Sequence, residues 1–106
     1  MAKRPHLMTH VYVADCGDGL IKIGATSTPH VRHNGIQTDH PKYPHGTVRM
    51  VRMWPHDQAY VVEQTAIRLM AARSERLRWE WFYTSPRRAC ATVRKAIRMV
   101  DERDLV

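Results

Sequence analysis

The stretch LIKIGATSTPHVR (residues 20–32) decides the fold of this chain. Alternating apolar residues lead to a glycine, and a helix-start signal follows directly. Thr28 suits the N-cap position of a helix, and Pro29 suits the first helical position, where its missing N–H costs nothing. We therefore predict a strand followed by a short helix, with Arg32 held in the first turns of that helix beside the strand end.

The segment LMTHVYVA (residues 7–14) predicts an antiparallel partner for this strand, which covers residues 20–25, and DCGDG (residues 15–19) predicts the turn between them. Side chains alternate between the two faces of a strand. A loop with an odd number of residues places the apolar side chains of both strands on one buried face, and the five residues of this turn satisfy that condition. We then expect Tyr12 and Lys22 together on the opposite face.

The length and composition predict one globular domain over residues 1–106, with a core over about 7–100 and a short basic lead over 1–6. Of the 106 residues, 43% are hydrophobic, and 17 Lys and Arg against 10 Asp and Glu give a formal net charge of +7. This excess favours a polyanionic partner, and nucleic acid is the commonest one. A basic protein without such a partner is the alternative.

The two cysteines, Cys16 and Cys90, have no metal-ligand spacing and no partner cysteine nearby, which fits a reducing cytoplasm. No apolar run approaches the roughly 18 residues that span a bilayer, and the first residues lack the apolar core of a signal peptide. We therefore expect a cytoplasmic protein that does not enter the membrane. Among the seven histidines only His30 and His33 have helical i, i+3 spacing, and exposed or capping roles explain the set better than a metal site.

The segment TVRMVRMW (residues 47–54) predicts a third strand, which Pro55 stops. Its alternation is imperfect, and either a bulge or burial on both faces would explain that. The other predicted elements are, in order, a helix over 29–37, a loop over 38–46, a helix over 56–72, a charged connector over 74–78 and a last helix over 86–100.

Glu63 interrupts the apolar face of the helix predicted over 56–72. A carboxylate at such a position is partly desolvated, which is costly unless a cation pairs with it. Two interpretations fit this position. One is a structural salt bridge, for example to Arg32, and the other is a metal ligand.

The segment WEWFY (residues 79–83) contains four of the eight aromatic residues. Such a cluster could stack on nucleic-acid bases, but aromatic residues at this density more often close a small core. We therefore favour the core interpretation.

The last predicted helix starts with Ser85 as its cap and Pro86 in its first turn, and it separates into an apolar face and a cationic face. Five cations on one face favour a surface that contacts the phosphate backbone over a merely solvated face. The expected nucleic-acid contacts are Arg87, Arg88, Arg94, Lys95 and Arg98.

Several short motifs follow one another along the chain. They are HVY (10–12), KIG (22–24), Arg32 eight residues after that glycine, Glu63 on a helix and EWF (80–82). In this order and spacing the chain resembles the GIY-YIG nuclease superfamily, and within it the compact branch with a Lys-Ile-Gly second signature and a C-terminal Glu-Trp-Phe. The resemblance covers about residues 8–85.

The resemblance implies a small α/β (α+β) domain, with a three-stranded antiparallel β-sheet flanked by helices, in agreement with the elements above. It also implies a metal-dependent DNA endonuclease that hydrolyses phosphodiester bonds with one divalent cation, Mg²⁺ or Mn²⁺. Glu63 would hold the metal, and Tyr12 would take the proton from the attacking water. Arg32 would stabilise charge on the scissile phosphate, and Lys22 would favour the phenolate of Tyr12 or touch phosphate. A neighbouring cation makes sense because an unperturbed tyrosine, with a pKa of about 10, is a poor base near neutrality.

The chain departs from the family pattern at three positions. His10 stands where the first signature begins with glycine, Ile67 where a histidine often follows the glutamate, and Trp79 where a glycine usually precedes Glu-Trp-Phe. None of these changes removes a core catalytic group. They leave an accessory role open for His33, His40 and Tyr43.

Two other classes of function remain alternatives. A non-catalytic nucleic-acid-binding module on the same scaffold would keep the cations, but its four key side chains would not converge. An interaction or structural protein without nucleic acid would have Arg94, Lys95 and Arg98 engaged in intramolecular ion pairs. DNA is the expected partner, and the oligomeric state is left open.

Overall fold

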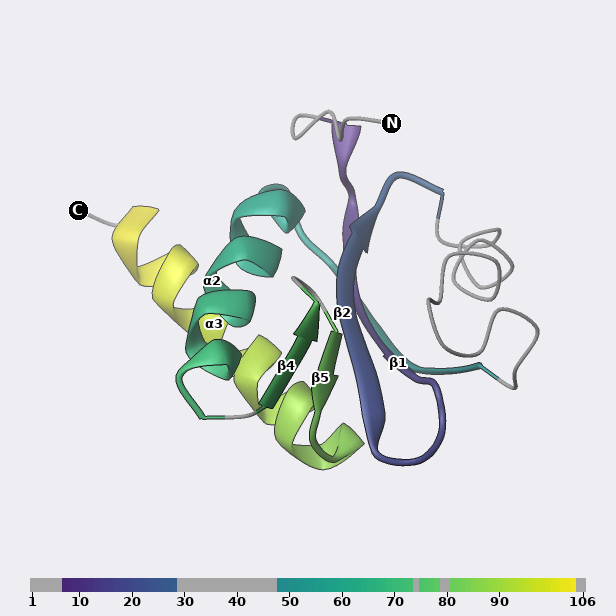
Figure 1. The fold of residues 1–106 in the computed structure, drawn as a ribbon. Coiled ribbons are helices and arrows are strands. Elements are labelled where there is room, and N and C mark those ends of the chain that lie inside the picture. The colour runs from purple at the N-terminus through teal and green to yellow at the C-terminus, as the bar shows by residue number, and fades with distance from the viewer. Residues whose placement is uncertain (1–6, 29–47, 74, 79–80, 105–106) are drawn as a thin grey trace.

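The computed structural model describes residues 7–28, 48–73, 75–78 and 81–104 of the chain. These residues form a small α+β fold in which two helices cover one face of an antiparallel sheet (Figure 1). The sheet has five strands in the order β3-β1-β2-β5-β4. The elements are β1 (His10–Asp15), β2 (Leu20–Thr26), β3 (Arg49–Pro55), α2 (Ala59–Ala71), β4 (Glu75–Arg78), β5 (Trp81–Tyr83) and α3 (Pro86–Asp104).

The first hairpin has the register that the sequence predicts. Val13 of β1 lies opposite Ile23 of β2, so the apolar side chains of the two strands share one face. Tyr12 and Lys22 share the other face, as expected from the odd-numbered turn. β1 begins at His10 and not at the start of the segment predicted for it.

The turn between β1 and β2 depends on two glycines. Gly17 and Gly19 have φ angles of 88° and 79°, in the left-handed region that glycine adopts without steric cost. The N–H of Gly17 also donates a 2.9 Å hydrogen bond to the Asp15 carboxylate. These two features close the turn and hold the register of the hairpin.

β3 contains a bulge where it pairs with β1. Val13 lies opposite Arg52, but the next residue of β1, Ala14, lies opposite Met50, so Val51 is an extra residue in the ladder. An extra residue shifts the alternation of side chains by one position. The bulge, one of the two predicted causes of the imperfect pattern of this strand, is confirmed.

The sheet has two more strands than the three predicted, because β4 lies in the segment predicted as a charged connector and β5 lies in the aromatic segment WEWFY. All three predicted strands are present, and β4 pairs with β5, which pairs in turn with β2. The charged sequence of β4 gives no alternating apolar signal. It becomes a strand because β5 offers it an open edge, and charged residues are common on edge strands.

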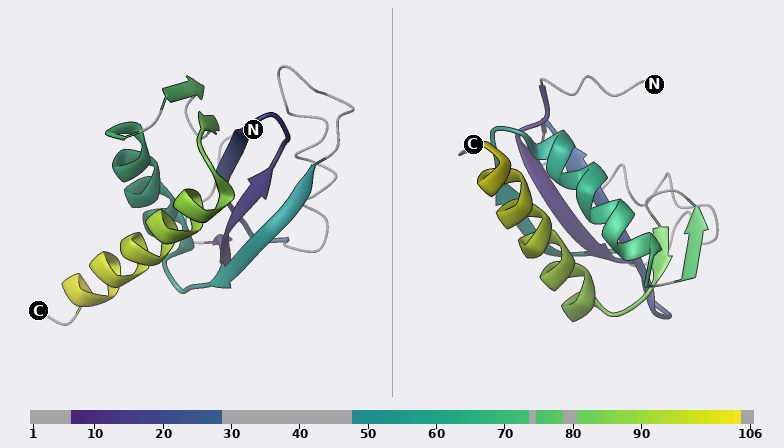
Figure 2. Two further views of the ribbon diagram at one scale, coloured as in Figure 1. Left: turned by 90° about the horizontal axis from the view of Figure 1, so that it is seen from below. Right: turned by 90° about the vertical axis from the view of Figure 1, so that its left-hand side faces the viewer.

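Each face of the sheet carries its own apolar cluster. The helix-side core joins apolar side chains of β1 and β2 to those of α2 and α3, and it includes Phe82. The two helices lie side by side over this face (Figure 2). The far-side core lies on the opposite face, and its buried members are Tyr12, Ala14, Cys16, Leu20, Val48 and Trp81. Because Trp81 and Phe82 are both buried, the core interpretation of the aromatic segment is confirmed for them.

α3 begins as the sequence predicts, with the N–H of Arg88 donating a 3.1 Å hydrogen bond to Ser85 Oγ. It continues to Asp104, past the predicted end at Val100. Neither helix in the described part of the chain is long and apolar enough to cross a membrane. The predicted lead over 1–6, helix over 29–37 and loop over 38–46 lie outside the described residues.

Candidate active site on the far face of the sheet

Tyr12 and Lys22 lie together on the sheet face that points away from the helices. Neighbouring strands place them there, since Tyr12 lies opposite Gly24 and Lys22 lies opposite Ala14. The Lys22 ammonium nitrogen is 6.0 Å from the centroid of the Tyr12 ring. Both side chains are enclosed, with exposed fractions of 0% for Tyr12 and 3% for Lys22. A buried lysine beside a buried phenol is unusual, because removing an ammonium group from water is costly.

Trp81 forms the other side of the Lys22 environment. It belongs to β5, where it lies opposite Lys22, and the Lys22 nitrogen is 5.0 Å from the Trp81 ring. The faces of aromatic rings attract cations, most strongly when water is excluded. Lys22 is therefore held between two aromatic rings, and its charge is fixed next to the phenol of Tyr12. The positive charge of an ammonium group favours the ionised form of a nearby acid, whereas burial, which is complete for Tyr12, disfavours it.

Gly24 provides the space that Tyr12 occupies. A Cβ atom at position 24 would overlap the Tyr12 hydroxyl and the ring carbons beside it. The phenol therefore lies directly over the backbone of Gly24, and only glycine leaves room for it. The glycine of the Lys-Ile-Gly motif thus fixes the position of the Tyr12 hydroxyl on the sheet.

The pKa of Cys16 depends on two opposing effects in this site, burial and the positive charge of Lys22. Burial raises the pKa of its thiol to about 11, and this effect outweighs the positive charge of Lys22, which lowers it. Cys16 is therefore a neutral thiol near neutral pH and not a nucleophile. Its role is to pack in the far-side core.

Glu63 is buried on α2, as its place in the apolar pattern suggests, with an exposed fraction of 1%. Gln64 Nε2 donates a 2.9 Å hydrogen bond to Glu63 Oε1. A buried carboxylate offers the hard oxygen ligand that Mg²⁺ and Mn²⁺ prefer, and these ions often take few protein ligands and several waters. In the described part of the chain, no three His, Cys, Asp or Glu side chains gather as a metal-binding group.

α2 packs against β2, the strand that carries Lys22 and Gly24. β5 pairs with β2 over Leu20 to Lys22, and α2 begins near the other end of β2 (Figure 1). The described structure therefore brings Tyr12 and Lys22 together on the far side of the sheet. Glu63 belongs to α2, which packs on the helix side of the same strands. Arg32 and the possible accessory residues His33, His40 and Tyr43 lie outside the described residues.

The five cations predicted to contact nucleic acid all lie on α3 and are all exposed. None of them forms an ion pair with another residue in the parts of the chain that the structure describes. The interaction-protein alternative, which required ion pairs at Arg94, Lys95 and Arg98, is therefore not supported there. However, α3 packs on the helix side, so the sheet separates these cations from Tyr12 and Lys22.

Sequence reasoning missed the roles of Gly24 and Trp81 in the site. Both residues stood inside recognised motifs, but only the register of β2 with β1 and β5 reveals what they touch.

Comparison with known proteins gives one clear relationship. The model of the T5orf172 domain matches residues 9–100. No match was found among curated proteins or among solved structures. Because the matched residues span β1 through most of α3 and include Tyr12, Lys22 and Glu63, the chain belongs to the T5orf172 domain family.

Proposed function

We propose that this protein is a metal-dependent DNA endonuclease of the GIY-YIG type, which hydrolyses phosphodiester bonds. The observation that carries the proposal is the Lys22 ammonium fixed 6.0 Å from the Tyr12 ring, inside an enclosed aromatic environment. A tyrosine with an unperturbed pKa of about 10 is a poor base near neutral pH, and a neighbouring cation favours the phenolate that the reaction needs. Membership of the T5orf172 family adds support, because this domain is associated with nuclease-related proteins.

In the proposed reaction Tyr12 acts as the general base. Its phenolate, favoured by Lys22, takes a proton from water while the water oxygen forms a bond to phosphorus and the bond to the leaving oxygen breaks. Arg32 stabilises the charge that develops on the phosphate. Glu63 is the residue that would hold Mg²⁺ or Mn²⁺, which supplies further stabilisation of that charge when bound.

DNA would be held through its phosphates, with Arg87, Arg88, Arg94, Lys95 and Arg98 as the proposed contacts. The two free, buried cysteines, Cys16 and Cys90, fit a reducing environment, and we place the protein in the cytoplasm on that basis.

A non-catalytic nucleic-acid-binding module is the second candidate. It is favoured by the enclosure of Tyr12 and Lys22, because a base must reach its water and its phosphate. It is also favoured by the separation of these two residues from the cations of α3.

A plasmid-nicking experiment distinguishes the endonuclease from the binding module. Purified protein is incubated with supercoiled plasmid in Mg²⁺, in Mn²⁺ and in chelator, alongside Tyr12→Phe, which keeps the ring and removes the base. The endonuclease nicks DNA only with a metal, and Tyr12→Phe binds DNA but loses at least about 100-fold in rate. Binding without cleavage by the wild-type protein under all conditions would favour the module.

A further inference from the structure

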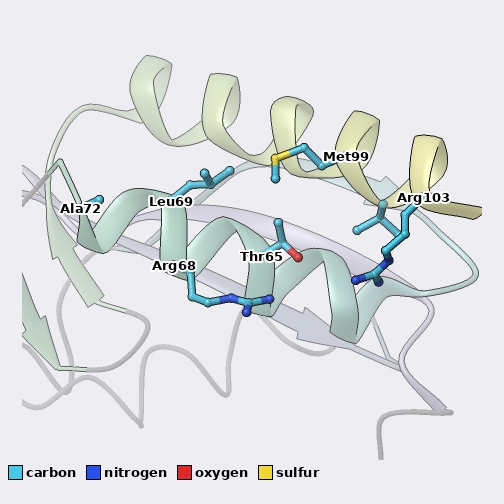
Figure 3. Close-up of a pocket in the computed structure, with 7 residues that line it drawn as sticks. Thr65, Arg68, Leu69, Ala72, Met99 and Arg103 are labelled. Atoms are coloured by element: carbon cyan, nitrogen blue, oxygen red, sulfur yellow. The ribbon is translucent and has the colours of Figure 1, made fainter.

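A groove of about 340 Å³ runs between α2 and α3 (Figure 3). It lies on the outer side of the helix layer, away from Tyr12 and Lys22, so the proposed nuclease chemistry does not use it. Thr65 and Leu69 of α2 line it together with Ala72, the residue that caps this helix, and Met99, Val100 and Arg103 line it along α3.

The centre of the groove is apolar. Leu69 and Met99 extend toward each other from the two helices (Figure 3). The exposed fraction of Met99 is 43%, which makes it one of two large hydrophobic side chains left exposed among the described residues. Methionine is common on surfaces that bind apolar partners, because its flexible side chain adapts to their shape. Thr65, Leu69 and the capping residue Ala72 have i, i+4, i+7 spacing, so the groove is about 10 Å long, or two helical turns.

Two arginines border this apolar centre, Arg68 from α2 and Arg103 from α3. They are the only charged residues among the described residues that line the groove. Both are exposed, and neither forms an ion pair with another described residue. An occupant that matches both features must combine apolar side chains with negative charges.

We propose that the α2–α3 groove binds an acidic amphipathic helix of a protein partner. Apolar residues of that helix, at i, i+3 or i+4 and i+7, contact Leu69 and Met99, and its carboxylates pair with Arg68 and Arg103. A nucleic acid matches the groove less well, because phosphates gain nothing from contact with leucine and methionine side chains.

The test uses two labelled synthetic peptides of about 14 residues, or about four helical turns. Both have leucine at the i, i+3, i+4 and i+7 positions, and one has glutamate and the other lysine at the remaining positions. Binding to the full chain is measured by fluorescence anisotropy at fixed salt. We expect the glutamate peptide to bind at least about tenfold more tightly than the lysine peptide.

Substitutions of groove residues then test whether the peptide binds in the groove. Arg103→Glu should weaken the glutamate peptide about tenfold or more, and Met99→Ser should weaken both peptides. Arg52→Glu makes the same charge change on β3, outside the groove, and should leave binding within about twofold. Melting temperatures of all variants are measured alongside. Arg103 is exposed, so its variant stays informative even if Met99→Ser unfolds the protein.

Three results would overturn the proposal. The first is equal binding of the two peptides. The second is an equal loss in Arg103→Glu and Arg52→Glu, which would reflect net charge alone. The third is a loss of duplex DNA binding in Arg103→Glu with peptide binding unchanged, which would assign the groove to nucleic acid.

Discussion

The helix-side core and the far-side core lie on opposite faces of the same strands, and they bury different kinds of side chain. The helix-side core is apolar, with Phe82 and the hairpin side chains packed against two helices. The far side buries a phenol and an ammonium group, Tyr12 and Lys22, next to Trp81. Because side chains alternate along β1, β2 and β5, neighbouring residues of one strand lie in different cores. One face supplies stability, and the other holds a charge in place at some cost in stability.

The largest expected effect is at Glu63, a buried charge among the apolar side chains of α2. Glu63→Gln keeps the shape of the side chain and removes the charge that would hold the metal, so cleavage should fall by about 10³-fold. Folding should survive, and DNA binding should persist or tighten because one negative charge is removed. Nicking activity and melting temperature are measured on the same preparation.

A matched control for this change is Gln64→Ala, which removes the hydrogen bond to Glu63 but not the carboxylate. We expect it to lower cleavage less than about tenfold. If Glu63→Gln instead loses about 3–5 kcal/mol of unfolding free energy, Glu63 is half of a buried ion pair. A stable Glu63→Gln that cuts DNA at the wild-type rate would exclude the metal role.

Neighbouring residues Phe82 and Trp81 give the most direct comparison of the two faces. Phe82→Ala creates a cavity in the helix-side core and should lower the unfolding free energy by about 3–5 kcal/mol, measured by urea denaturation. Trp81→Phe keeps an aromatic ring beside Lys22 and should cost less than about 1.5 kcal/mol, while reducing the nicking rate. Equal losses of stability without any change in nicking would remove the functional distinction between the faces.

A smaller effect is expected at Gly24. The methyl group of Gly24→Ala would displace the Tyr12 phenol, so stability should fall by about 1–3 kcal/mol and cleavage by about tenfold. In a Tyr12→Leu background the same methyl group should cost much less, because the atoms that it would overlap belong to Tyr12. Additive losses in this double-mutant cycle would contradict the proposed packing of the phenol on Gly24.

The smallest effect on chemistry is expected from the cations of α3. Replacing Arg94, Lys95 and Arg98 with glutamine should reduce the salt dependence of DNA binding, by about 0.9 in log–log slope for each phosphate that is no longer neutralised. Because the sheet separates these residues from Tyr12, the cleavage rate at saturating DNA should stay within about threefold. Loss of cleavage at saturating DNA would mean that these residues act in the chemical step.

The sequence was sufficient to predict features that depend on local alternation and capping. The odd-numbered turn placed Tyr12 and Lys22 on one face, and the register of the hairpin confirms this placement. The cap at Ser85 follows from the same local rules. Glu63 could be predicted as buried, because helical periodicity puts it among the apolar side chains that α2 packs against the sheet.

Features that depend on pairing between distant segments could not be predicted. β4 has a charged sequence with no strand periodicity, and it is a strand only because β5 lies beside it. The overlap of Tyr12 with the space above Gly24, and the Trp81 ring over Lys22, require the registers of three strands. A single-sequence pattern contains propensities but not these registers.

The pairing of β5 with β2 joins segments that are distant in the sequence, and this affects the order in which the molecule folds. β1 and β2 meet across a short turn, whereas Lys22 and Trp81 lie 59 positions apart in the sequence. Closing that longer loop costs about 2 kcal/mol more entropy than closing the hairpin. We therefore expect β5 to dock late and to open first, exposing Lys22 to water before the hairpin separates. Amide hydrogen exchange would show this as faster exchange in β5 than in β1, and equal protection of the two strands would contradict it.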